Sequence, residues 1–117
     1  MNVKPVKSFQ DLIVWQKAYK FVLSTYLFSE KFPHTESKLT SQLRRSAISL
    51  PASIAESFHK QTRAEKVQLQ KIAENSIDEC RYYLIVAKEL AYGDIEELMS
   101  QLAQVTQLLT IYYSDSI

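Results

Sequence analysis

The scarcity of turn-forming residues most limits what this chain can fold into. One glycine and three prolines occur among its 117 residues. A protein built from many strands needs such residues at each reversal of the chain, because tight turns require backbone angles that other residues rarely adopt. The sequence therefore predicts an all-α protein. Its length fits a single domain, residues 1–117, which is long enough to bury one hydrophobic core.

Hydrophobic residues recur at intervals of three and four along the chain, the pattern of helices with one buried face. Cap and turn signals divide the pattern, because Ser8 and Thr62 can cap helix starts, Pro33 disfavours helix before it and Gly93 can end a helix. Four helices joined by short turns predict an antiparallel up-and-down four-helix bundle. We expect the helices at about residues 8–30, 36–60, 63–92 and 94–113.

The first predicted helix is hydrophobic around most of its circumference. One set of residues follows the spacing of a core face: Phe9, Leu12, Ile13, Tyr19, Val22, Leu23, Tyr26 and Leu27. A second set lies on the adjoining flank: Val14, Trp15, Ala18, Phe21 and Phe28. One core cannot bury both, and a large side chain left in water forgoes about 1.5–3 kcal/mol. We therefore expect the flank to form a subunit interface; alternatively, Trp15 and Phe21 cover one end of the bundle.

The charges are unevenly distributed along the chain. Residues 1–71 hold 12 Lys and Arg against 5 Asp and Glu, whereas residues 72–117 hold 2 against 8. Such polarity can orient subunits or attract a polyanion, although salt bridges within one bundle can also absorb it.

Five basic residues are candidates for contacts with nucleic-acid phosphates. They are Lys60, Arg63, Lys66, Arg44 and Arg45. Two alternatives remain open for them. Charges of this kind on a helical protein are often only solvated surface, and Arg45 shares a helical face with Glu56, so that it can pair with this carboxylate instead.

No pattern of residues predicts an enzyme. His34 and His59 have no evident nucleophile partner, and Cys80 lies on the hydrophobic side of the third predicted helix. Glu56 and His59 stand one turn apart, as in di-iron bundles, but such a site needs a second pair that the sequence lacks. Glycine-rich phosphate loops and Cys-x-x-Cys pairs are also missing. We expect no catalysis, no metal and no other cofactor.

The sequence also bears on location. One cysteine cannot form an intrachain disulfide, and the first residues lack the apolar segment of a secretory signal. No apolar run approaches the roughly 20 residues that span a bilayer. We expect a cytoplasmic protein that does not associate with a membrane.

Several segments of the chain resemble the four helix bundle protein family, also called 23S rRNA intervening sequence protein. They follow the order of the family pattern and comprise residues 9–18, 32–33, 39–56 and 72–79. The family usually has Gly where Ser57 stands. Because Ser57 carries a Cβ there, packing or assembly can differ at this position.

The resemblance implies a bacterial four-helix bundle that assembles as a ring-shaped homopentamer. Members are encoded within intervening sequences of 23S rRNA genes or elsewhere in genomes, and their molecular role is generally unassigned. The related accessory proteins of diversity-generating retroelements form similar pentamers that bind nucleic acid and a reverse transcriptase. We therefore expect a non-enzymatic homo-oligomer that binds RNA or DNA. The alternative is a protein scaffold or accessory subunit, for example for a reverse transcriptase.

Overall fold

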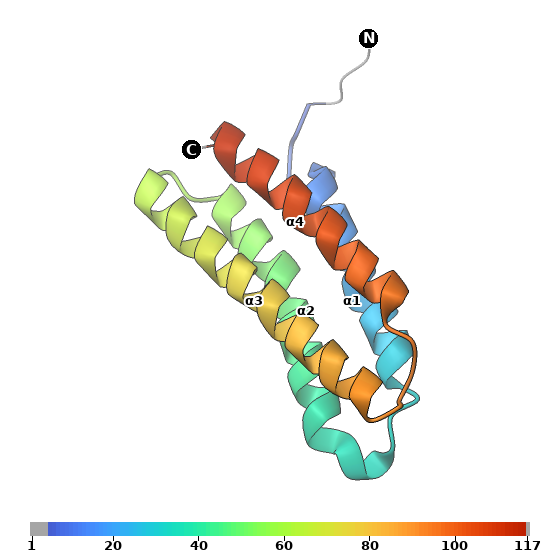
Figure 1. The fold of residues 1–117 in the computed structure, drawn as a ribbon. Helices are drawn as coiled ribbons and strands as arrows, with labels where there is room; N and C mark the ends of the chain where they lie inside the picture. The colour runs from blue at the N-terminus through green and yellow to red at the C-terminus, as the bar shows by residue number, and fades with distance from the viewer. Residues whose placement is uncertain (1–4, 117) are drawn as a thin grey trace.

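The computed structural model describes residues 5–116 and shows four helices (Figure 1). No strand occurs within this range, which confirms the all-α prediction. Two short 3-10 turns, η1 (Phe9–Asp11) and η2 (His34–Glu36), precede the first and second helices. The helices are α1 (Ile13–Ser29), α2 (Ser37–Phe58), α3 (Arg63–Glu89) and α4 (Glu96–Ser116).

One hydrophobic core joins all four helices. Each helix packs against the next along the chain, and α1 also packs against α4 (Figure 1). The core side chains recur at helical spacing on α2, α3 and α4, as the sequence predicts. Large core side chains without exposed surface occur on all four helices and include Phe21, Leu43, Leu50, Ile54, Leu84 and Leu102.

The first helix begins later than expected. Ser8 does act as a cap, because its hydroxyl accepts a hydrogen bond from the Gln10 amide at 3.2 Å. The Asp11 carboxylate completes this cap by accepting the Ser8 amide at 3.1 Å. These bonds belong to η1, however, and Leu12 then adopts an extended conformation with φ −75° and ψ 127°. The extended residue separates η1 from α1.

The turn between α3 and α4 differs from the prediction that Gly93 ends the third helix. The left-handed residue is Ala91, with φ 62°. The Tyr92 amide donates to the Ala87 carbonyl and the Ala91 amide to the Lys88 carbonyl, both at 2.9 Å. This is the Schellman arrangement, in which two amides beyond the helix satisfy its last carbonyls.

Gly93 is needed for a different reason, the close approach of Phe28. A Cβ at Gly93 would lie 2.7 Å from Cε1 of Phe28, and the φ of Gly93 is 154°. Phe28 in turn packs edge-on against Phe32, with ring centroids 5.4 Å apart. The Phe28 ring therefore fastens the end of α1 to the turn before α4.

The last helix extends further than expected, to Ser116. Tyr113 is 1% exposed, and its hydroxyl donates to Ser57 Oγ at 3.0 Å. The same Ser57 hydroxyl donates to the Ile54 carbonyl at 2.8 Å. Ser57, where the family pattern usually has Gly, thus anchors the last turns of α4 to α2.

The structure changes much of the assignment of faces on the first helix, although Val22 of the predicted core face is buried. Val14 is 4% exposed, and Ala18 and Phe21 have no exposed surface. A side chain that its own chain covers cannot contact a second subunit, so the predicted interface is wrong for these three residues. Trp15 and Phe28 are half-buried.

Residues assigned to the core face lie outside instead. Ile13 is 62% exposed, Tyr19 47%, Leu23 49% and Leu27 65%. We call these four residues the outer face of α1. The inner face includes the small side chains of Ala18, Thr25 and Ser29, which are buried and let α1 approach its neighbours closely.

Candidate functional site

The outer face of α1 is the main hydrophobic surface that the bundle leaves uncovered on this helix. Its side chains alternate with the exposed polar residues Gln16 and Lys20. Tyr19 lies parallel to Trp15, with ring centroids 5.1 Å apart and an interplanar angle of 6°. The stacked pair gives this end of α1 a broad aromatic surface. Exposed hydrophobic surface of this kind often marks a protein interaction site.

Three of the candidate basic residues lie around the turn between α2 and α3. Thr62 caps α3, because its hydroxyl accepts the Glu65 amide at 3.2 Å, and so the prediction of this cap is confirmed. The Lys60 ammonium lies 3.8 Å from the Glu65 carboxylate. Arg63 and Lys66 form no ion pair with any residue in the described range. Since they stand three residues apart on α3, they share one helical face.

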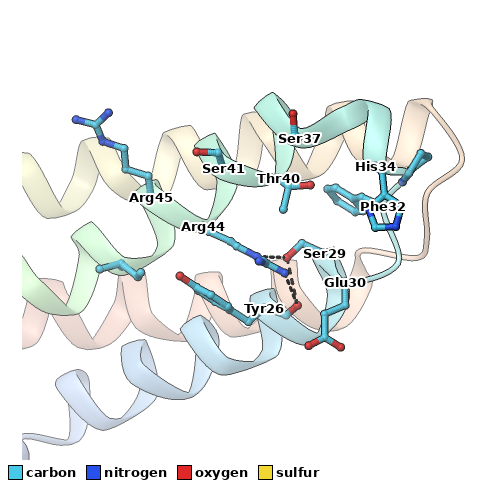
Figure 2. Close-up of a pocket in the computed structure, with 12 residues that line it drawn as sticks. Tyr26, Ser29, Glu30, Phe32, His34, Ser37, Thr40, Ser41, Arg44 and Arg45 are labelled. Carbon is cyan, nitrogen blue, oxygen red and sulfur yellow. Dashed lines mark hydrogen bonds between the residues drawn. The ribbon is translucent and has the colours of Figure 1, made fainter.

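Arg44 crosses from α2 to the end of α1 (Figure 2). Its Nε donates to Ser29 Oγ at 2.8 Å, and its Nη2 donates to the Tyr26 carbonyl at 3.3 Å. The guanidinium carbon also lies 4.5 Å from the centroid of the Tyr26 ring, within the range of a cation–π contact. These contacts fix the orientation of the guanidinium.

The Arg44 side chain lines a groove of about 770 Å³ between α1 and α2. Arg45 belongs to the rim, but Figure 2 shows its side chain pointing away from Arg44. Neither arginine forms an ion pair with a described carboxylate, so the structure shows no pairing of Arg45 with Glu56. The remaining lining residues are Tyr26, Ser29, Glu30, Phe32, Pro33, His34, Ser37, Thr40, Ser41 and Ile48.

The five basic residues therefore do not form one patch. Arg44 and the end of α2 at Phe58 are separated by about 20 Å, given a rise of about 1.5 Å per residue. Arg44 and Arg45 lie in the first half of α2, whereas Lys60, Arg63 and Lys66 lie beyond its end. The structure offers two separate candidate sites.

Cys80 is buried, and burial raises the pKa of its thiol to about 12. A hydrogen bond with Ser46 lowers the pKa and the charge of Glu79 raises it, but both effects are smaller than that of burial. A thiol with such a pKa holds its proton at neutral pH and is a poor nucleophile.

The other candidate chemical groups are dispersed. His59 is exposed and lies edge-on to the rings of Phe9 and Phe58, with centroids 6.4 and 5.3 Å away. Across residues 5–116, no three His, Cys, Asp or Glu side chains come together as metal ligands do. In the same part of the chain, no helix is both long and apolar enough to cross a membrane.

Sequence reasoning missed the groove because its residues come from two helices. Arg44 and its partner Ser29 are 15 positions apart, and Ser29 is a small polar residue at the end of a helix. One available signal was the polar set Ser37, Thr40 and Ser41, which precedes Arg44 by three to seven residues and therefore extends along the same side of α2.

Two comparisons with known proteins bear on the family of the chain. A search of curated proteins gave no significant match. The family described as 23S rRNA-intervening sequence protein matches residues 10–114, which covers all four helices almost completely. The match confirms the resemblance seen in the sequence. The chain belongs to the 23S rRNA-intervening sequence protein family.

Proposed function

We propose that this protein is a non-enzymatic, cytoplasmic homo-oligomer that binds nucleic acid through its phosphates. The observation that carries the proposal is the outer face of α1, where four large hydrophobic side chains are 47–65% exposed. Complete burial of such side chains contributes about 1.5–3 kcal/mol each, so covering the exposed half contributes on the order of 1 kcal/mol per residue. A second copy of the chain gains this energy in every contact that covers the face.

Closed assemblies of identical subunits are the usual outcome of such contacts. The ring of five expected from the resemblance is one such assembly, and the up-and-down order of helices is the arrangement we propose for each subunit. In a ring, the turn between α2 and α3 is repeated at equivalent positions. Arg63 and Lys66, which lack ion pairs within the described chain, then form a circle of positive charge. Such a circle suits a polyanion.

The salt dependence of RNA binding tests the proposed contacts. The variant Lys60→Gln, Arg63→Gln, Lys66→Gln should flatten the slope of log affinity against log salt by about 2, since each lost phosphate contact removes about 0.7–0.9. A matched control removes the same charge at the exposed residues Lys31, Lys38 and Lys88. Fluorescence anisotropy with a short structured RNA at several salt concentrations gives both slopes. Equal slopes in the two variants would reject the three residues as contacts.

A protein scaffold is the second candidate function, favoured by the composition of α4. This helix begins with Glu96 and Glu97 and contains no Lys or Arg. An acidic helix repels nucleic acid and suits a basic protein partner, such as a reverse transcriptase. An oligomer that ignores RNA at low salt would support the scaffold over the nucleic-acid assembly.

A further inference from the structure

Arg44 keeps a free edge that faces the groove between α1 and α2. A guanidinium has five N–H donors, and the bonds to Ser29 and Tyr26 use one on Nε and one on Nη2. Nη1 forms no hydrogen bond with any described residue, and no carboxylate within residues 5–116 lies at ion-pair distance. The Nη1–Nη2 edge can therefore hold an oxyanion with two parallel hydrogen bonds.

The guanidinium is positioned before any ligand arrives. Ser29 Oγ accepts from Arg44 and donates to the Tyr26 carbonyl at 3.2 Å, so both anchors of the arginine are themselves fixed. The Tyr26 ring supports the guanidinium plane from one side. Preorganised groups lose less conformational entropy on binding, which increases affinity.

The walls of the groove suit an organic ligand better than a bare ion. Tyr26, Phe32, Pro33 and Ile48 supply hydrophobic surface, and the volume of about 770 Å³ lies within the 300–1,000 Å³ typical of small-molecule sites. Figure 2 shows Thr40 on the same side of α2 as Arg44, facing Ser29 and Phe32. The Thr40 hydroxyl forms no hydrogen bond with the described residues that line the groove.

The charged residues at the rim leave the groove with positive character. Arg44 and Arg45 are both cationic. Glu30 is the one acidic residue of the lining, and Figure 2 shows its carboxylate pointing away from Arg44. An anionic ligand can therefore reach Arg44 without meeting that carboxylate.

We propose that this groove binds a nucleoside phosphate. The Nη1–Nη2 edge of Arg44 and the Thr40 hydroxyl contact the phosphate oxygens, and the nucleoside lies on the hydrophobic wall. The groove has room for one nucleotide and not for a duplex. If the ligand is an unpaired nucleotide of a bound strand, this inference rests on the proposed nucleic-acid function. If the ligand is a free nucleotide, the inference does not depend on that function.

Calorimetric titration of the full-length protein at low salt tests the site with uridine 5′-monophosphate, uridine and inorganic phosphate. A parallel titration uses a single-stranded hexanucleotide with a 5′-phosphate. Arg44→Gln should weaken nucleotide binding about tenfold or more, because it removes two hydrogen bonds to a charged group. Lys88→Gln makes the same charge change at an exposed residue that does not line the groove, and should alter the affinity less than about twofold.

A second pair of variants covers the case in which Arg44→Gln unfolds the chain. Thr40→Val replaces the hydroxyl with a methyl group and should weaken binding about threefold to tenfold, whereas Thr35→Val makes the same change at an exposed residue outside the groove and serves as its control. If, in both pairs, the variant and its control bind the nucleotide with equal affinity, the proposed site is rejected. Uridine that binds as tightly as its monophosphate would overturn it as well.

The outcomes separate the site from the proposed function. If the hexanucleotide binds and Arg44→Gln and Lys88→Gln do not differ, the proposed nucleic-acid function is supported and the groove site is rejected. If the monophosphate binds through Arg44 and the hexanucleotide does not bind, the groove site is supported and the proposed nucleic-acid function is rejected. A change of oligomeric mass in Arg44→Gln without any nucleotide binding would instead assign the groove to a subunit contact.

Discussion

Cys80 illustrates how position within the bundle controls the chemistry of a single residue. Its sequence position on a hydrophobic stripe predicts a packing role, and the structure places it in the core with no exposed surface. Removal from water raises the pKa of the thiol from about 9 to about 12. The residue is therefore part of the core and a source of pH dependence in folding.

Stability should fall at alkaline pH because of this thiol. Between about pH 9 and 12 the unfolded chain has released the proton and the folded chain has not. The free energy of unfolding then decreases by up to about 1.4 kcal/mol per pH unit, whereas below pH 9 the thiol contributes no slope. Urea unfolding at pH 8 and pH 10 measures this decrease. Cys80→Ala should show a smaller decrease, and an equal decrease would refute the assignment to Cys80.

Two neighbouring turn residues should respond to substitution in opposite directions. Gly93→Ala places a Cβ against the Phe28 ring in a backbone conformation that alanine rarely adopts, and should cost about 1–3 kcal/mol. Ala91→Gly relieves a left-handed alanine with φ 62° and should be neutral or stabilising by up to about 1 kcal/mol. Thermal unfolding of both variants checks this. Similar destabilisation by both changes would contradict the account of the turn.

Prediction of single residues succeeded where the signal was local. Ser8 and Thr62 act as caps as predicted, because a cap depends on bonds to amides two or three residues away. The position of the left-handed residue was missed by two positions. The contact between Gly93 and Phe28 joins residues 65 positions apart, and no local pattern reveals it.

At the scale of helices, α1 shows the limit of hydrophobic periodicity. Its two hydrophobic sets adjoin each other around the helix, and spacing alone does not say which of their residues face the core. A usable signal existed, because Gln16, Lys20 and Glu30 lie on the side of Leu23 and Leu27 and are exposed with them. The better-separated hydrophobic patterns of α2, α3 and α4 place the buried side chains of each helix on one face.

Substitutions on the two faces of α1 should therefore act differently. Phe21→Ala removes a fully buried ring and should lower the free energy of unfolding by about 3–5 kcal/mol. Leu23→Ala changes a side chain that is 49% exposed and should cost less than about 1 kcal/mol within the isolated subunit. Urea unfolding followed by circular dichroism at low protein concentration compares them. A larger loss in Leu23→Ala would restore the original assignment of the faces.

The whole molecule exposes more surface than a compact monomer of its size. Its accessible area is 7572 Å², whereas the usual relation for a 13.5 kDa monomer gives about 6,500 Å². The four residues of the outer face of α1, which are 47–65% exposed, are part of this area. A partner that covers them brings the area closer to the usual value, which agrees with the proposed self-association.

In the folded molecule, the charges are arranged differently from their order in the sequence. The sequence separates a basic half from an acidic half, but the fold places the candidate basic residues at two distant positions, one on α2 and one beyond its end. In the proposed functions, the groove at Arg44 binds one nucleotide, and the turn after α2 contacts the phosphate backbone of a nucleic acid. Sequence position alone could not separate them, because the path of α2 through the bundle sets their distance.

Size-exclusion chromatography with light scattering tests the central claim, self-association through the outer face of α1. The wild type should have a mass of two or more times 13.5 kDa. The variant Leu23→Glu, Leu27→Glu should elute as a monomer with unchanged helical circular dichroism, and Ile111→Glu, at a residue 58% exposed on α4, should keep the wild-type mass. A wild-type monomer, or an oligomer that survives both glutamates on α1, would contradict the claim.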